Sequence, residues 1–375
     1  MKVLITGGHV TPAQAVIEQL RKKQGVDIAY VGRKSTMEGD ESDSYEYQVI
    51  QKLGIPFFNL ITGRLQRKLT PYTLWSLIKI PVGLIHSLSI IIQVKPDVVC
   101  AFGGYLSTPI CFWAYLFHIP IVIHEQTQTA GFANRINSLF AAKIAVSFTS
   151  SLPYFAKGKT VLTGNPLRSA IFSHQITSPE IQEFSNNNLS VPKIYVTGGN
   201  QGSHIINQVI FKSLPRLAAE FAIIHQTGDQ KSTGDFDMAQ NIRLHLPSKQ
   251  QDRYLPIKFI YDDDIGGVLN LADLVICRSG ANTVLELAAL GKKAILVPLG
   301  ISAQGDQAKN ALLLQKISGA EIILENDLNE KLLVSKITLL LGQVVDDFKL
   351  KAQQYIHPTA ASDLAELVIA QTKLN

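Results

Sequence analysis

Apolar residues along this chain form short continuous runs, each followed by a polar or glycine-rich turn and then by an amphipathic stretch. In the first half these runs predict strands at 2–6, 27–31, 57–59, 98–102, 121–124 and 144–146. In the second half we expect strands at Tyr195, 223–224, 259–260, 275–276 and 295–296. Continuous apolar runs are typical of parallel strands buried on both faces. The alternation of strands with helices therefore predicts an α/β fold with doubly wound parallel sheets.

The segment 275–298, VICRSGANTVLELAALGKKAILVP, has the clearest pattern of strand, small-residue turn, helix and second strand. Backbone N–H groups at the start of this helix, near Gly280, favour an anion such as a diphosphate, because they lack helical partners and lie at the positive end of the helix dipole. Glu286 lies further along the same helix and has a carboxylate that can accept hydrogen bonds from ribose hydroxyls. An ordinary strand–helix–strand unit with Glu286 facing water stays open as the alternative.

Two glycine-rich turns follow strands near the start and the middle of the chain. The first comprises residues 6–9, TGGH, after which Thr11 is the expected N-cap and Pro12 the first helical residue. The second comprises residues 198–203, GGNQGS. Glycine is needed where the backbone takes a positive φ or approaches a ligand closely, so the two turns indicate two related halves.

The length of 375 residues exceeds the usual size of a single core, so we expect two domains. We place them at 1–163, with a C-terminal helix at 358–375 packing back on it, and at 164–357. Apolar residues make up 46% of the chain and charged residues 17%, which excludes disorder. The three cysteines lack metal-binding spacing and are expected to be buried thiols in a reducing cytosol. They are Cys100, Cys111 and Cys277. We also expect no signal peptide, because the chain enters a strand at once.

The segment 72–96 is apolar nearly all round, with only Lys79 and His86 interrupting, and its core at 80–94 is too short to span a bilayer. One interpretation is a buried core helix. The other is a helix that enters a membrane surface through Leu74, Trp75, Ile78 and Leu84, beside Arg64, Arg67, Lys68 and Lys79. The net charge of +5 suits an anionic leaflet. We expect no nucleic-acid partner, because no stacking aromatics accompany the charge.

Ten short motifs occur in a fixed order along the chain. They are TGGHV (6–10), KPDVV (95–99), GGYLSTP (103–109), IHEQ (123–126), AGFANR (130–135), GNPLR (164–168), GGNQGS (198–203), HQTG (225–228), CRSGANTVLE (277–286) and GDQAKNA (305–311). With these motifs the chain resembles, over essentially its whole length, the MurG family of bacterial N-acetylglucosaminyltransferases. The resemblance implies the GT-B glycosyltransferase fold, in which two doubly wound Rossmann-like domains face a central cleft.

The resemblance also implies an activity. Members of the family transfer GlcNAc, with inversion, from UDP-GlcNAc to the C4 hydroxyl of the MurNAc in undecaprenyl-pyrophosphoryl-MurNAc-pentapeptide (lipid I). The product, lipid II, enters peptidoglycan synthesis, and so serves cell-wall biogenesis, cell shape and cell division. We therefore expect a peripheral protein on the cytoplasmic face of the cell membrane, bound to its anionic surface. Other cell-wall synthesis proteins are candidate partners.

The family's donor residues map mainly onto the second domain, the UDP-GlcNAc-binding one. Phe259 and Ile260 would lie by the uracil, with the Ile260 backbone reading its edge, and Asn200 would approach the diphosphate. Glu286 would hold the ribose. Asp306 and Gln307 would hold the sugar hydroxyls, with Arg168 and Asn310 in support. The other expected donor residues are Thr6, Gly7, Gly8, Ser279, Gly280, Ala281, Asn282 and Thr283.

The first domain would bind lipid I and the membrane, with the acceptor pyrophosphate near the turns at 6–9 and 103–105. The expected acceptor residues are Gly103, Gly104, Tyr105, Gln126, Thr127 and Asn134. Transfer needs a base for the acceptor hydroxyl as UDP leaves. His9 is the first candidate, since imidazole titrates near neutral pH, and Glu125 is the second. His9 as an orienting or diphosphate-binding residue, and Glu125 as a partner of Arg135 or another local donor, remain alternatives.

The acidic run 262–264 is interpreted as the start of a helix and not as a metal site. We expect no catalytic metal and no cofactor. The chain departs from the family's pattern at four places, which carry Leu4-Ile5, Thr127, Asn200 and Asp306. Three alternatives stay open. They are a transferase for another polyprenyl or glycolipid acceptor, an enzyme like the UDP-GlcNAc 2-epimerases, and a non-catalytic nucleotide-sugar-binding protein.

Overall fold

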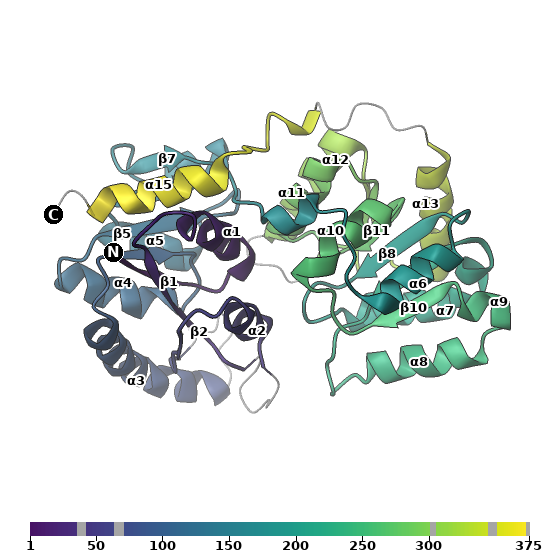
Figure 1. Ribbon diagram of the computed structural model, residues 1–375, viewed down its shortest axis with the longest axis horizontal. Coiled ribbons are helices and arrows are strands. Elements are labelled where there is room, and N and C mark those ends of the chain that lie inside the picture. Colours follow the sequence, from purple (N-terminus) through teal and green to yellow (C-terminus); the bar gives the residue numbers. More distant parts are fainter. Residues whose placement is uncertain (36–42, 64–70, 301–304, 344–350, 373–375) are drawn as a thin grey trace. The chain divides into compact units, whose positions relative to one another are not determined.

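The computed structural model describes residues 1–35, 43–63, 71–300, 305–343 and 351–372, with the backbone alone over 71–79. It forms two compact units. The first unit comprises residues 1–168 and 357–375, and the second comprises residues 169–356. Each unit contains one parallel sheet with helices packed on it, as Figure 1 shows.

The first sheet has seven strands in the order β3-β2-β1-β4-β5-β6-β7, all parallel. They are β1 (Lys2–Thr6), β2 (Asp27–Gly32), β3 (Phe57–Asn59), β4 (Val98–Ala101), β5 (Ile121–Glu125), β6 (Lys143–Val146) and β7 (Thr160–Leu162). The strand order reverses at β1 and β4, which pair side by side. In open α/β sheets the carboxyl ends of the strands at such a reversal are the usual place for a ligand.

The helices of the first unit cover both faces of its sheet (Figure 1). Among the described elements they are α1 (Val10–Leu20), α2 (Tyr45–Lys52), α3 (Pro71–Val94), α4 (Ser107–Leu116), α5 (Phe132–Phe140), the 3-10 helix η1 (Thr149–Tyr154) and α15 (Ala360–Thr372). Along β1, Val3 and Ile5 pack with α1 and α15, whereas Leu4 packs with α3 and α4. Burial of alternate residues on opposite faces explains why the strands read as continuous apolar runs.

The second sheet has six parallel strands in the order β10-β9-β8-β11-β12-β13. They are β8 (Lys193–Thr197), β9 (Ala222–Gln226), β10 (Tyr254–Ile257), β11 (Leu274–Cys277), β12 (Ala294–Leu296) and β13 (Glu321–Ile322). The helices around them are η2 (Ser169–Phe172), α6 (Pro179–Asn187), α7 (His204–Glu220), α8 (Asp235–His245), α9 (Ser248–Gln251), α10 (Asp262–Leu271), α11 (Ala281–Leu290), α12 (Asp306–Ser318) and α13 (Glu330–Gly342).

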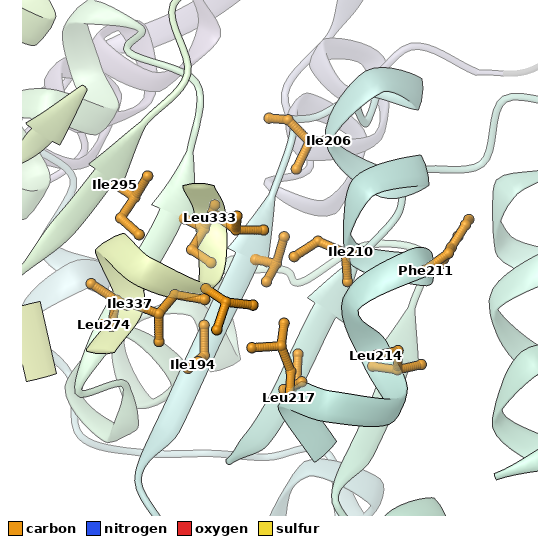
Figure 2. Packing of buried hydrophobic residues seen from close by; sticks show 14 of the residues in the cluster. Ile194, Ile206, Ile210, Phe211, Leu214, Leu217, Leu274, Ile295, Leu333 and Ile337 are labelled. Atoms are coloured by element: carbon orange, nitrogen blue, oxygen red, sulfur yellow. The ribbon is translucent and has the colours of Figure 1, made fainter. Parts of the chain in front are cut away.

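The core of the second unit lies between its sheet and helices α7 and α13. Figure 2 shows Ile210 and Leu217 of α7 turned toward Ile194 of β8, with Leu333 and Ile337 of α13 beside it. The spacing of three or four residues along each helix puts these side chains on one face. The amphipathic pattern of both helices is therefore satisfied within this unit.

The predicted fold class is confirmed, since both units carry the doubly wound parallel sheet. Two local predictions are wrong. Residues 259–260 do not form a strand, because the strand in this region is β10, which ends at Ile257. β10 contains Pro256, which is tolerated because β10 lies at the edge of the sheet. The N-cap of α1 is His9 and not Thr11, because the helix begins at Val10 and its first turn accommodates Pro12. All three cysteines are buried, as predicted.

Helix α3 carries the apolar segment that left two interpretations open. Ile90, Ile91 and Val94 are buried in the first unit, whereas Val82 and Ile85 are exposed. The predicted membrane-facing side chains Leu74, Trp75, Ile78 and Lys79, and the residues Arg64, Arg67 and Lys68, lie outside the described part of the structure. None of the helices that the structure describes combines the length and hydropathy of a membrane span.

Candidate functional site

The turns after β1 and β4 touch each other through backbone atoms. Gly7 has a φ of 137°, and Gly103 and Gly104 have φ values of 69° and 76°. The Gly8 N–H donates to the Gly103 carbonyl at 3.2 Å, and a Cβ on Gly7 would lie 2.8 Å from the Phe102 carbonyl carbon. Both the positive φ and the close contact require glycine. The predicted residues of these two turns therefore lie together.

Glu125, at the end of β5, is buried and accepts hydrogen bonds from its own loop. Its Oε1 accepts from Thr127 N at 2.9 Å and from Thr127 Oγ1 at 2.6 Å. Its Oε2 accepts from Gly131 N at 2.9 Å and from Asn134 Nδ2 at 3.0 Å. Three N–H groups thus donate to the carboxylate, and it shares the Thr127 hydroxyl with the Thr129 carbonyl, which lies 2.6 Å from Thr127 Oγ1. Glu125 therefore holds its loop to the start of α5, which is the local-donor alternative of the two roles considered for it.

His9 is exposed at the start of α1, beside the Gly7–Gly8 turn. Desolvation by the surrounding protein lowers its pKa, although the exposure of the imidazole limits this effect, and the negative charge of Glu125 acts in the opposite direction. A lowered pKa keeps the imidazole neutral near pH 7, which is the form that accepts a proton. The two predicted catalytic residues therefore lie close enough for the charge of Glu125 to act on the pKa of His9.

His124 contacts the segment after β7, and Arg168 belongs to that segment. The His124 Nε2 atom lies 3.1 Å from Ser147 Oγ and 3.4 Å from the Gly164 carbonyl. Burial lowers the pKa of His124 to about 3, so it stays neutral. Arg168, grouped with the donor residues in the sequence analysis, is buried in the first unit and donates to Tyr45 Oη at 3.4 Å.

Tyr30 and Glu46 lie behind the Gly7 turn, and the sequence analysis did not select either. Tyr30 Oη lies 3.2 Å from the Gly7 carbonyl and donates to Glu46 Oε1 at 2.7 Å. Desolvation raises the pKa of Glu46 to about 7, against the lowering effect of the hydrogen bonds from Tyr30 and from the Arg33 backbone. The only sequence signal was a tyrosine hydroxyl within an otherwise apolar strand. The pair connects α2 to the backbone of the turn.

We expect Glu46 to make folding stability depend on pH. Its carboxyl pKa is raised in the folded protein, so the folded state binds more protons than the unfolded state between pH 4.5 and about 7. The contribution of Glu46 to the free energy of unfolding therefore falls as the pH rises through this window. A pKa change of one unit corresponds to about 1.4 kcal/mol. Because the Glu46 side chain is partly exposed, we reduce the sum over the whole change and expect a fall of about 2 kcal/mol. Urea denaturation from pH 5 to 8 measures it.

The variant Glu46→Gln keeps the shape of the side chain but cannot ionise, so the free energy of unfolding of the wild type minus that of the variant should fall across this window. Glu183, exposed on α6, offers the matched control Glu183→Gln, whose profile should follow the wild type. Parallel profiles for wild type and Glu46→Gln would contradict the assignment.

The second unit repeats the backbone contact between neighbouring turns. Gly199 and Gly202, after β8, have φ values of 85° and 75°. The Gly202 N–H donates to the Gly199 carbonyl at 3.0 Å, and a Cβ on Gly202 would overlap the Thr227 carbonyl after β9. Asn200 is exposed at the tip of this turn. The turn can therefore present both backbone and the Asn200 side chain to an anion.

The predicted base-binding segment directly follows β10. The Ile260 N–H donates to Gln226 Oε1 at 3.1 Å, so the carbonyl oxygen is the backbone atom by which Ile260 can contact a ligand. Phe259 is half-buried, and its ring centroid lies 6.4 Å from that of Tyr261. If the Ile260 backbone reads the edge of the uracil, it does so by accepting a hydrogen bond at its carbonyl oxygen.

The start of α11 is held to the start of α12. Gly280 is the N-cap of α11, and the first-turn N–H groups that follow it are not used by the helix itself. Ser279 Oγ donates to the Gln307 carbonyl at 2.8 Å, and Asn310 Nδ2 donates to the Ser279 carbonyl at 3.2 Å. Glu286 is only 5% exposed, so the alternative in which it faces water is wrong. Four predicted donor positions thus lie together, namely Ser279, Gly280, Gln307 and Asn310.

The remaining sugar-binding candidates lie at the start of α12. Gln307 Oε1 accepts from Leu299 N at 2.9 Å. The side-chain amide nitrogen of Gln307 is therefore the group that can donate to a ligand. Asp306 is the first residue of the helix. The acidic run 262–264 forms the first turn of α10, as predicted, and Asp264 accepts from Ser178 N at 3.0 Å. The described residues contain no cluster of three His, Cys, Asp or Glu side chains that could hold a metal.

Comparison with known protein families gives two separate matches. Residues 6–146 match the glycosyltransferase family 28 N-terminal domain. Residues 193–368 match the glycosyltransferase family 28 C-terminal domain. The two matches correspond to the two sheets described above.

Curated relatives are similar along nearly the whole chain. A protein of Treponema denticola is 34% identical over 342 residues, which cover 88% of this chain and 84% of the relative. One of Clostridium perfringens is 33% identical over 341 residues, 90% of this chain and 89% of the relative. Each is named UDP-N-acetylglucosamine--N-acetylmuramyl-(pentapeptide) pyrophosphoryl-undecaprenol N-acetylglucosamine transferase.

Two solved structures share the fold. Acinetobacter baumannii MurG superposes with a TM-score of 0.64 at 25% identity, covering 98% of this chain and 99% of that one. The UDP-GlcNAc 2-epimerase from Neisseria meningitidis, bound to UDP-GlcNAc, superposes with a TM-score of 0.64 at 15% identity, covering 99% and 100%. At this identity the second likeness concerns the fold alone.

Proposed function

The chain belongs to the MurG family within glycosyltransferase family 28, and from this we infer that it transfers GlcNAc from UDP-GlcNAc to the C4 hydroxyl of the MurNAc in lipid I. The product is lipid II, for peptidoglycan synthesis. The observation that carries the proposal is the similarity, along about nine-tenths of the chain, to transferases named for this reaction. The 2-epimerase alternative has only the shared fold in its favour.

We propose that UDP-GlcNAc binds at the carboxyl edge of the second sheet. The start of α11 offers N–H groups and the positive end of a helix dipole to the diphosphate. Glu286 lies about one and a half turns further along and suits the ribose hydroxyls. Asp306 and Gln307, tied to this helix through Ser279, are the candidates for the sugar hydroxyls.

The acceptor is assigned to the first unit. Its pyrophosphate would lie against the paired turns that contain Gly7 and Gly103, and Tyr105, Gln126, Thr127 and Asn134 would line the same edge of the sheet. In the reaction, the acceptor oxygen bonds to the anomeric carbon as the bond from that carbon to UDP breaks. His9 takes the hydroxyl proton, and the donors of α11 stabilise the charge on the departing diphosphate.

The reaction itself is tested by incubating the full chain with UDP-GlcNAc and a short-chain lipid I analogue, and by reading product masses. We expect an added HexNAc on the analogue and release of UDP. Conversion of UDP-GlcNAc into its 2-epimer, without transfer, would support the epimerase alternative instead.

Glu286→Ala should weaken UDP binding. The change removes a charged acceptor of ribose hydroxyls, and hydrogen bonds to charged groups contribute about 1.5 to 3 kcal/mol, or about 10- to 150-fold in affinity. Calorimetric titration with UDP measures the effect. The exposed carboxylate of Glu183 provides the control Glu183→Ala. An unchanged UDP affinity in a folded Glu286→Ala protein would remove the ribose assignment.

His9→Ala should lower turnover by about 10² to 10⁴ while leaving UDP affinity intact, because the base acts in the chemical step and not in donor binding. Steady-state transfer at saturating donor and acceptor measures it. His174→Ala, at an exposed histidine of the second unit, should retain wild-type turnover. Near-normal turnover in His9→Ala would instead fit an orienting histidine.

We further propose reversible attachment to the anionic cytoplasmic face of the membrane through α3, α4 and α5. Exposed apolar side chains occur on all three helices, among them Ile85, Leu116, Phe117 and Leu139. The helices are neighbours, since Trp113 Nε1 donates to the Leu84 carbonyl at 2.8 Å and Tyr115 packs on Phe140 with centroids 5.4 Å apart. Exposed apolar surface on adjacent helices is typical of a contact with lipid or protein.

The double variant Ile85→Glu, Leu116→Glu should pellet less with vesicles that contain anionic lipid than the wild type does. It places charge where apolar area would be buried, and wild-type binding should weaken with salt because basic residues contribute about 1 kcal/mol each near such a surface. Leu244→Glu, at a leucine of α8 that is as exposed as Ile85, is the control. Equal pelleting of wild type and double variant would exclude this surface.

A further inference from the structure

Arg278 occupies the position directly after β11, and its side chain is only 13% exposed. Its Nη2 donates to Ser203 Oγ at 2.7 Å and to Glu325 Oε1 at 2.6 Å. Its Nη1 donates to the Val297 carbonyl at 3.1 Å. A guanidinium has donors in a rigid planar fork, so these partners fix it from three directions.

Glu325 completes the arrangement from the loop after β13. Its second oxygen, Oε2, accepts from Gly300 N at 2.7 Å, and the side chain is 14% exposed. Desolvation acts to raise the pKa of Glu325, but the Gly300 N–H and Arg278 outweigh it and lower the pKa. The carboxylate therefore stays ionised at neutral pH and connects two loops through separate oxygens.

The segments that this pair joins are those assigned to the donor. Ser203 is the N-cap of α7 and closes the turn that carries Asn200. Leu299, between Val297 and Gly300, donates to the side chain of Gln307. Arg278 itself precedes Ser279 and the start of α11. One ion pair thus contacts the loops after β8, β11 and β12, at the edge where the donor is proposed to lie.

Buried ion pairs contribute little net stability, because the loss of hydration offsets most of the attraction. Their best-supported effect is to select one geometry. The loops here contain glycines at 199, 202 and 300, so their backbone has more freedom than the sheet that carries them. A rigid fork between them removes that freedom before a ligand binds, which lowers the cost of binding.

We propose that the Arg278–Glu325 pair positions the donor-binding loops of the second unit, so that Arg278 and Glu325 determine affinity for UDP-GlcNAc without contacting it. The inference rests on the proposed donor site. It deepens that proposal by assigning a role to two residues outside the expected contacts.

The test compares Arg278→Lys, Glu325→Gln and the double variant by UDP calorimetry and by steady-state transfer. Lysine keeps the charge but lacks the fork, and glutamine keeps the shape but loses the charge. Each single variant should weaken UDP binding and raise the KM for UDP-GlcNAc by about tenfold. The KM for the acceptor and kcat at saturating donor should change by less than about threefold. The double variant should be little worse than either single one, because the two residues act as a unit.

The chain offers a matched control in the ion pair of Glu321 and Lys336, which is also partly buried, with a distance of 2.7 Å. Glu321→Gln breaks a pair of the same kind, so its UDP affinity should equal that of the wild type. Wild-type UDP affinity in folded Arg278→Lys and Glu325→Gln proteins, or an equal loss in Glu321→Gln, would overturn the inference. If the wild type binds UDP but does not transfer, the proposed reaction fails and UDP affinity alone decides on the pair.

Discussion

Burial of both faces of each parallel sheet is the constraint on which the rest of this structure depends. Helices cover both faces of the sheet in each unit, so a ligand cannot bind on the faces of the strands. Polar groups gather at the carboxyl ends of the strands, where the loops begin. Glu125 ends β5, and His9 and Asn200 lie three residues beyond the ends of β1 and β8. The fold thus decides where a site lies before any side chain decides what it binds.

At that edge the two units use the same physical device. Neighbouring turns approach through backbone atoms, with Gly7 against Phe102 in one unit and Gly202 against Thr227 in the other. No side chain fits into these contacts, and each turn needs a positive φ. Close backbone contact brings N–H groups and helix starts together, which favours anions. Both proposed substrates carry a diphosphate, so this shared device suits each unit to its own ligand.

Buried carboxylates hold the loops around these turns. Glu125 gathers four donors in the first unit, and Glu325 joins Arg278 and the Gly300 backbone in the second. In each case the carboxylate bonds to loop atoms and its charge is compensated within the protein. Side chains with this much internal bonding are better suited to positioning than to proton transfer. The exposed imidazole of His9 differs in this respect, which supports its assignment as the base.

The sequence alone determined the fold class, most strands and the positions of the glycine-rich turns, because buried parallel strands and obligatory glycines leave a local pattern. Contacts between residues far apart in the chain decided the rest. Residues 259–260 looked like a strand, yet pairing with β9 selected 254–257 despite Pro256, and the strands of two or three residues at β7 and β13 gave no pattern. The roles of Tyr30, Glu46 and the Arg278–Glu325 pair emerged only from tertiary structure, which also selected the local-donor role of Glu125 from the two that the sequence left open. The partners of Tyr30, Glu46 and Arg278 lie 13 to 75 residues away in the chain, so these hydrogen bonds have no local signature.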